Sequence, residues 1–169
     1  MERTGIITMK SNPLTLLGNQ VKVGDKAPDF TALKNDMSPF SLSDAKGKVV
    51  IISSMPSVDT PVCELQTTIF NQKAGENPEI SVVTISVDLP FALSRFCANE
   101  GIESAVTLSD HRDLDFGTKY GFIIKELRLL ARGVVVIDKE GTIKHLEVVP
   151  EVTDQPDYDK ALEIAQSLI

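Results

Sequence analysis

The sequence predicts an α/β fold, with a mixed central sheet flanked by helices and an N-terminal β-hairpin extension over residues 1–20. The 169 residues correspond to one domain at about 150 residues per domain, and 42% of them are hydrophobic, which is enough for one core. Short apolar, β-branched runs are typical of strands buried on both faces. Strand and helix patterns then alternate and close with a hairpin and a helix, the order of a mixed sheet. We expect a single domain over residues 1–169.

Turn signals separate short β-prone runs in the opening segment. Gly5–Met9 and Leu14–Leu17 flank Lys10–Pro13, and an Asn-Pro turn between two such runs predicts a hairpin. Asp29–Leu33 and Phe40–Leu42 are strand candidates on either side of another turn.

A buried strand, a loop and a helix are predicted next. Val49–Ser53 is an apolar, β-branched run, and Ser54–Thr60 has the Ser, Pro, Asp and Thr content of a loop. Pro61–Lys73 predicts a helix, because proline suits a first helical position and threonine suits the N-cap before it. The apolar face of this helix is predicted to contain Leu65, Ile69 and Phe70.

The second half of the chain continues the alternation of strands and helices. The expected elements are a strand at Ile80–Val87, a helix at Pro90–Asn99 with Phe91, Leu93 and Phe96 as apolar positions, a strand at Ala105–Ser109, a weak helix at Asp110–Tyr120, and strands at Gly133–Asp138 and Thr142–Val149. Apolar residues at helical spacing from Tyr158 to Ile169 predict a C-terminal amphipathic helix. Because the thioredoxin fold has this order at its heart, the expected domain is thioredoxin-like.

Charge and hydropathy exclude several classes of protein. With 17 Lys and Arg against 24 Asp and Glu the net charge is −7, which disfavours nucleic acid and anionic membranes as partners. The longest apolar runs have four residues, whereas a membrane-spanning helix needs about 20. The first ten residues contain no apolar signal segment. We therefore expect a cytoplasmic protein.

Two cysteines, Cys63 and Cys97, do not make a disulfide framework in a chain of this size. In a reducing compartment they are core residues, metal ligands or redox groups. His111 and His145 could join the two cysteines as zinc ligands, but the sequence has no Cys-x-x-Cys or His-x-x-x-His spacing. No bound metal is therefore expected.

The segment Met55–Gln66 carries the strongest chemical signal. Cys63 is predicted in the first turn of a helix that follows a buried strand, where free N–H groups and the helix dipole favour the nucleophilic thiolate. Thr60 lies three residues earlier, within reach of the sulfur or of a substrate oxygen. Pro56 lies on the incoming loop, where its ring is placed to shield the sulfur from bulk water.

The pattern Pro-x-x-x-Thr-x-x-Cys after a buried strand resembles the active-site signature of the peroxiredoxins. The fuller form, Ser57-Val-Asp-Thr-Pro-Val-Cys63-x-x-Gln66, resembles that of their thiol peroxidase branch. The resemblance extends to Gly24-x-x-Ala-Pro-x-Phe30, to the strand end Ser86-Val-Asp88 and to Ala131-Arg-Gly-Val134.

The resemblance implies a thiol-dependent peroxidase that reduces hydrogen peroxide and organic hydroperoxides in antioxidant defence. Cys63 is then the peroxidatic cysteine, which becomes a sulfenic acid. The resemblance further implies that Thr60 positions the peroxide and that Pro56 shields the pocket. Arg132 would stabilise the thiolate and the leaving oxygen. Arg95, Arg112 and Arg128 are alternatives for that arginine.

Cys97 has two interpretations. It is either a core cysteine beside Phe96 or, as the resemblance to atypical two-cysteine enzymes implies, the resolving cysteine. In the second case it forms an intramolecular disulfide with Cys63, and a thioredoxin-type protein reduces that disulfide. The resemblance also implies a homodimer without a bound cofactor.

Two other functions fit the same fold. A disulfide oxidoreductase needs two thiols close in sequence, and Cys63-Glu-Leu-Gln66 has only one. A non-catalytic redox sensor or binding module would keep both cysteines without fast peroxide turnover.

Overall fold

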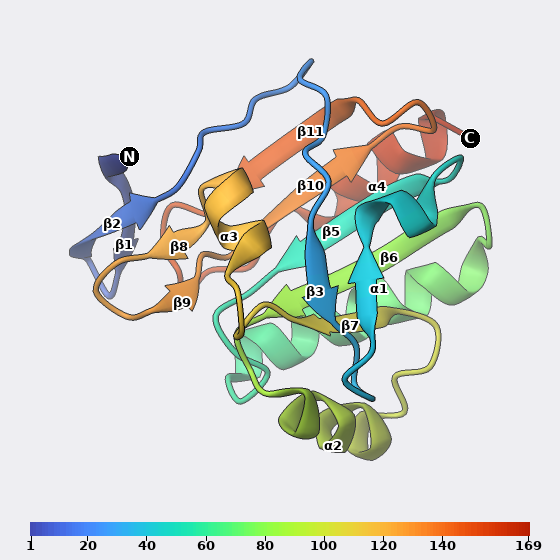
Figure 1. Ribbon diagram of the computed structural model, residues 1–169, viewed down its shortest axis with the longest axis horizontal. Coiled ribbons are helices and arrows are strands. Elements are labelled where there is room, and N and C mark those ends of the chain that lie inside the picture. The colour runs from blue at the N-terminus through green and yellow to red at the C-terminus, as the bar shows by residue number, and fades with distance from the viewer.

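Two β-sheets form the framework of the chain in the computed structural model, which describes residues 1–169 (Figure 1). The larger, seven-stranded sheet has the order β11-β10-β5-β6-β7-β3-β4. Its strands are β3 (Thr31–Leu33), β4 (Pro39–Ser41), β5 (Val49–Ser54), β6 (Ile80–Ser86), β7 (Val106–Ser109), β10 (Gly133–Ile137) and β11 (Ile143–Val148). The pairs β5–β6 and β6–β7 are parallel and the other pairs are antiparallel, so the sheet is mixed, as predicted.

Helices cover both faces of this sheet. They are α1 (Pro61–Glu76), α2 (Pro90–Glu100), α3 (Asp115–Tyr120) and α4 (Tyr158–Ser167), with a short 3₁₀ helix at Leu42–Ala45. Figure 1 shows α3 in front of the sheet and α4 behind it.

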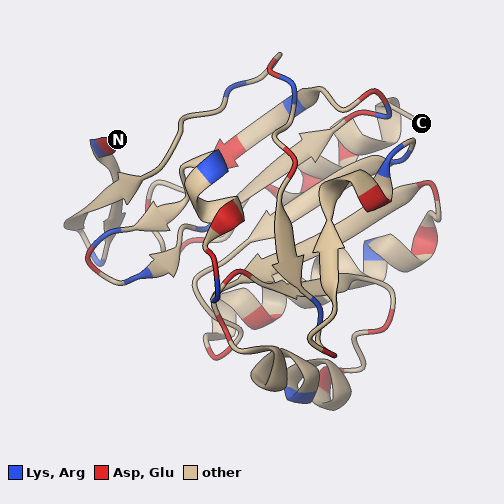
Figure 2. Ribbon diagram, viewed as in Figure 1, with Lys and Arg blue, Asp and Glu red and all other residues tan.

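Residues of the central strands alternate between two cores, as the pleat of a strand requires. Val49 and Ile51 of β5 pack with residues of α1 and α4, whereas Val50 and Ile52 pack with Phe116 of α3 on the other face. Acidic and basic residues mix over the helices and loops in Figure 2, and β5, β6 and β10 contain neither. None of the helices combines the length and apolarity needed to span a membrane.

The N-terminal hairpin belongs to a second sheet that the sequence did not predict. Strands β1 (Glu2–Met9) and β2 (Asn12–Leu17) pair with each other, and β2 also pairs with β8 (Ile123–Ile124), which pairs with β9 (Leu129–Leu130). The predicted hairpin is therefore present, but the turn is shorter than expected.

The start of α3 differs from the prediction of a helix from Asp110. The helix begins at Asp115, because the Asp110 carboxylate accepts hydrogen bonds from the N–H groups of Phe116 and Gly117 at 3.1 and 2.9 Å and so ties the preceding turn to the helix start. Leu114 at the N-cap has a positive φ of 50°, which interrupts regular helix. Burial raises the pKa of Asp110 to about 6.

Two predicted helix faces are also corrected. The buried face of α1 consists of Cys63, Gln66, Thr67, Phe70 and Ala74, whereas Leu65 is 41% exposed. In α2, Leu93 is buried as predicted but Phe91 is 69% exposed.

Candidate active site

The predicted nucleophile lies where β5 leads into α1, at the carboxyl end of the parallel strands. This is the edge at which open α/β sheets commonly hold their sites. Thr60 is the N-cap of α1, and Pro61 occupies the first helical position. The Thr60 hydroxyl accepts the N–H of Cys63 at 3.3 Å and donates to the carbonyl of Ser57 at 3.3 Å. Thr60 therefore fixes the backbone of Cys63, and its hydroxyl bonds the main chain rather than the sulfur.

Cys63 is fully buried in an apolar cluster with Met55, Val58 and Leu93, and Phe96 packs against it. Pro56, between Met55 and the helix, is buried as well. The structure places Pro56 on the loop between β5 and α1, directly after Met55, which shares the apolar cluster of Cys63. Bulk water has no direct access to the sulfur.

Asp88 fastens the loop that precedes Cys63. Its Oδ1 accepts the hydroxyl of Ser57 at 2.7 Å, and its Oδ2 accepts the N–H of Val58 at 2.8 Å and the hydroxyl of Ser86 at 2.8 Å. Because Asp88 lies two residues after the end of β6, these bonds tie the Cys63 loop to the end of the neighbouring parallel strand.

Gln66, one turn after Cys63, connects α1 to Arg132. Its Nε2 donates to Ser53 Oγ at 2.6 Å and to the Ser54 carbonyl at 3.2 Å. Its Oε1 accepts from Arg132 Nη1 at 2.9 Å. Since Gln66 is fully buried, all of its donors and its acceptor are committed to protein partners that fix its position.

Arg132 is the arginine that the structure brings into this region. It is 2% exposed, and its Nε donates to the carbonyl of Val152 at 2.8 Å. Nε and Nη1 have protein acceptors, and Nη2 has none. The alternatives Arg95, Arg112 and Arg128 are all exposed. A buried, doubly anchored guanidinium with a free donor face suits recognition of a developing negative charge.

Tyr158, at the start of α4, shares this environment. Its ring packs edge-on against Phe70 with the centroids 5.3 Å apart, and its hydroxyl is buried without a hydrogen-bond partner. Burial raises the pKa of Tyr158 to about 12; the positive charge of Arg132 lowers it and the charge of Cys63 raises it. Both groups therefore lie within electrostatic range of this hydroxyl.

Cys97, on α2, is a free thiol, as is Cys63, so the structure represents the reduced protein. Its side chain is partly buried, against the core that contains Ile102. Its Sγ lies 3.6 Å from Asn35 Nδ2 and 3.3 Å from Thr107 Oγ1.

Two residues of the site were quoted in sequence motifs without an assigned role, Gln66 and Asp88. Their hydrogen bonds connect segments far apart in the chain, which a linear pattern does not show. For Gln66 a signal did exist, because a polar residue one turn after Cys63 falls on the same helical face. No group of three or more His, Cys, Asp or Glu side chains gathers to hold a metal ion.

Comparison with known proteins gives one consistent result. The family described as Redoxin matches residues 22–162. A protein of Halalkalibacterium halodurans named thiol peroxidase is 57% identical over 163 residues, covering 96% of this chain and 98% of its own. A thiol peroxidase of Bacillus subtilis is 53% identical over 163 residues with the same coverage.

Solved structures show the same architecture. A peroxiredoxin-like protein from Aquifex aeolicus superimposes with a TM-score of 0.92 at 40% identity, covering 99% of this chain and 98% of its own. A thiol peroxidase from Chromobacterium violaceum, at 20% identity and a TM-score of 0.83, shares the fold over 95% of both chains.

Proposed function

The chain belongs to the Redoxin family and is a thiol-dependent peroxidase with a thioredoxin-like fold, and we propose that Cys63 is the residue that attacks the peroxide. The observation that carries this assignment is the position of Cys63. It lies buried in the first turn of α1, one turn from Gln66, which binds Arg132 directly. A fixed cation and a helix N-terminus together favour a reactive thiolate.

In the reaction the Cys63 thiolate attacks the distal oxygen of hydrogen peroxide or an organic hydroperoxide. A sulfur–oxygen bond forms, the oxygen–oxygen bond breaks, and the sulfur becomes a sulfenic acid. The leaving oxygen takes a proton and departs as water or an alcohol. Negative charge moves from sulfur to that oxygen during the step, so a donor held where the charge develops lowers the barrier.

Arg132 supplies that donor in the proposed mechanism. Its anchors at Val152 and Gln66 hold the guanidinium still, and Nη2 has no protein acceptor to give up when the peroxide binds. Thr60 fixes the Cys63 backbone through one lone pair of its hydroxyl oxygen and offers the second lone pair to the bound peroxide. Pro56 encloses the pocket, which strengthens these interactions by keeping water out.

Cys97 is the resolving cysteine in this proposal. Its thiol attacks the Cys63 sulfenic acid, a disulfide forms and water leaves, and a thioredoxin-type protein reduces the disulfide by two electrons. Cys97 lies on α2, and Leu93 of the same helix shares an apolar cluster with Cys63, so the two cysteines belong to neighbouring helices.

We also propose a cytoplasmic homodimer. Two free cysteines fit a reducing compartment. Leu65, Leu89 and Phe91 are exposed at the starts of α1 and α2, around the active site, and supply an apolar surface for a second subunit.

A coupled assay tests the proposed function. With thioredoxin, thioredoxin reductase and NADPH, the wild-type protein is expected to consume hydrogen peroxide continuously. The Cys97→Ser variant should oxidise Cys63 at the wild-type rate, but its turnover should fall sharply because no thiol in the chain resolves the sulfenic acid. Full turnover in Cys97→Ser would show that Cys97 does not resolve the intermediate.

A further inference from the structure

The thiol of Cys97 belongs to a closed ring of hydrogen bonds with two side chains outside the active site. Thr107 of β7 is 4% exposed, and Asn35 lies on the turn between β3 and β4. Thr107 Oγ1 donates to Asn35 Oδ1 at 2.8 Å, and Asn35 Nδ2 donates to Cys97 Sγ at 3.6 Å. The third side of the ring is the 3.3 Å contact between Cys97 Sγ and Thr107 Oγ1.

The direction of each bond follows from the protons available. A threonine hydroxyl has one proton, and Thr107 uses it for Asn35. Toward Cys97, Thr107 therefore presents a lone pair, and the Cys97 S–H must be the donor. Each group in the ring donates once and accepts once, so the ring is complete only while Cys97 is a protonated thiol.

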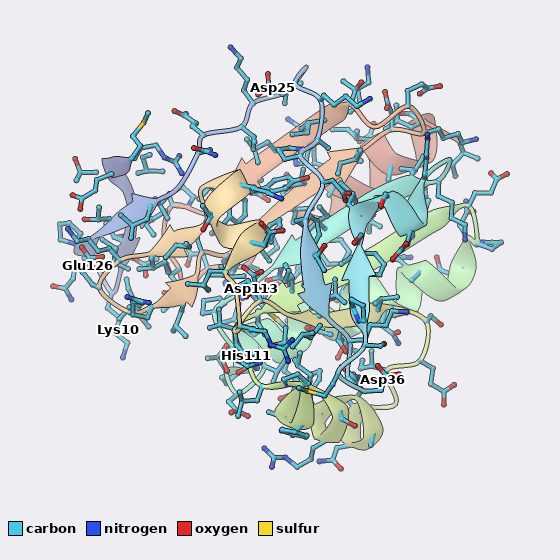
Figure 3. All side chains as sticks on the ribbon, in the orientation of Figure 1. Lys10, Asp25, Asp36, His111, Asp113 and Glu126 are labelled. Carbon is cyan, nitrogen blue, oxygen red and sulfur yellow. The ribbon has the colours of Figure 1, made fainter.

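The ring also connects three separate elements. It joins α2, through Cys97, to the sheet strand β7 and to the turn after β3. A cavity of about 370 Å³ opens beside these residues, lined also by Lys34, Asp36 and Glu103. Figure 3 shows Asp36 on this turn, beside α2. Space for a displaced side chain therefore exists next to the sulfur.

We propose that Asn35 and Thr107 form a latch that retains Cys97 in the reduced fold and limits the rate of disulfide formation. The inference rests on the proposed resolving role of Cys97. For its sulfur to reach Cys63, the Cys97 thiol must give up both bonds of the ring, and only then does it lose its proton and attack. Asn35 and Thr107 are positioning residues, because they act on Cys97 and touch neither the peroxide nor Cys63.

The latch has a consequence for peroxide tolerance. The Cys63 sulfenic acid has two fates: attack by Cys97 gives the disulfide, and reaction with a second peroxide gives the irreversible sulfinic acid. A latch that slows the first reaction gives the second more time. Asn35 and Thr107 would therefore set the peroxide concentration at which the enzyme inactivates.

The Thr107→Val variant tests the latch, because valine keeps the shape of threonine and removes the hydroxyl. After one equivalent of peroxide, rapid quenching with a thiol alkylator and mass spectrometry follow the loss of free Cys97. Since a net hydrogen bond of this kind corresponds to about two- to tenfold in a rate, disulfide formation should accelerate by that factor. The rate of the first oxidation should not change, and less sulfinic acid should form at a given peroxide concentration.

Two control variants and a second test variant complete the experiment. Thr107→Ser retains a hydroxyl and should restore the wild-type rate. Thr84 lies on β6, opposite Thr107, and its buried hydroxyl has no hydrogen-bond partner. Thr84→Val removes this hydroxyl and should leave the rate unchanged. Asn35→Ala breaks the same ring from the partly exposed turn and should accelerate disulfide formation even if Thr107→Val folds poorly.

The outcomes separate the latch from the resolving role of Cys97. Normal disulfide formation with unchanged or slower rates in Thr107→Val and Asn35→Ala would overturn the latch and leave Cys97 as the resolving residue. Absence of any Cys63–Cys97 disulfide in the wild-type protein would overturn both.

Discussion

The Cys63→Ser variant is expected to consume no hydrogen peroxide above the background of the buffer. A serine hydroxyl is not ionised near neutral pH, and oxygen lacks the nucleophilicity of a thiolate toward peroxide. Cys97 retains its thiol in this variant, but its hydrogen-bond partners are Asn35 and Thr107, and it shares no partner with Arg132. Stopped-flow measurement of peroxide loss over a single turnover checks the expectation.

The matched control is Cys97→Ser, which removes the other thiol and should retain the first oxidation. Thermal unfolding of both variants should show that the fold persists, because serine has nearly the volume of cysteine. Peroxide consumption by Cys63→Ser at a rate near that of the wild type would assign the reaction to Cys97 or to another group.

The Arg132→Met variant should reduce the second-order rate constant for Cys63 oxidation by about 10²–10³-fold, the effect of losing one donor aimed at a developing oxyanion. Methionine fills much of the same volume without the charge. The Val152 carbonyl and Gln66 Oε1 lose their partner, so the free energy of unfolding should also fall by about 1–3 kcal/mol. Rapid kinetics and denaturant unfolding measure the two effects separately.

Arg128→Met is the matched control, because Arg128 is exposed and lies four residues earlier, in the turn between β8 and β9. It should change neither the rate nor the stability measurably. If Arg132→Met oxidises Cys63 within about twofold of the wild-type rate, below the smallest effect expected of a lost donor, Arg132 only supports the fold and another group stabilises the leaving oxygen.

The central sheet was predictable because its strands are buried on both faces. All six residues of β5 and all five of β10 are buried, and such strands are read as short apolar runs. Strands β8 and β9 were missed because each has two residues, too few for a periodicity, and their pairing with β2 depends on the tertiary fold.

The face of α1 shows why the candidate site was only partly predictable. A search for apolar residues at helical spacing selected Leu65, which is exposed. The buried face instead contains Gln66 and Thr67, whose polar atoms find partners on β5, on Met55 and on Arg132. Polar residues on a buried face break the hydrophobic pattern where the site requires hydrogen bonds.

The choice of Arg132 among the arginines could likewise not be made from the residue pattern alone. The sequence offered several arginines for one role, and burial separates Arg132 from Arg95, Arg112 and Arg128. The bond from Arg132 to Gln66 spans 66 residues of the chain, so no local motif predicts it.

Mass spectrometry of the peroxide-treated wild-type protein tests the central claim most directly. One equivalent of peroxide should give a monomer that has lost two hydrogens, and its proteolytic digest should contain one disulfide-linked pair of peptides that carries Cys63 and Cys97. Thioredoxin should return this species to the reduced mass. A disulfide-linked dimer as the only product, or an unmodified Cys97 beside an oxidised Cys63, would contradict the intramolecular cycle.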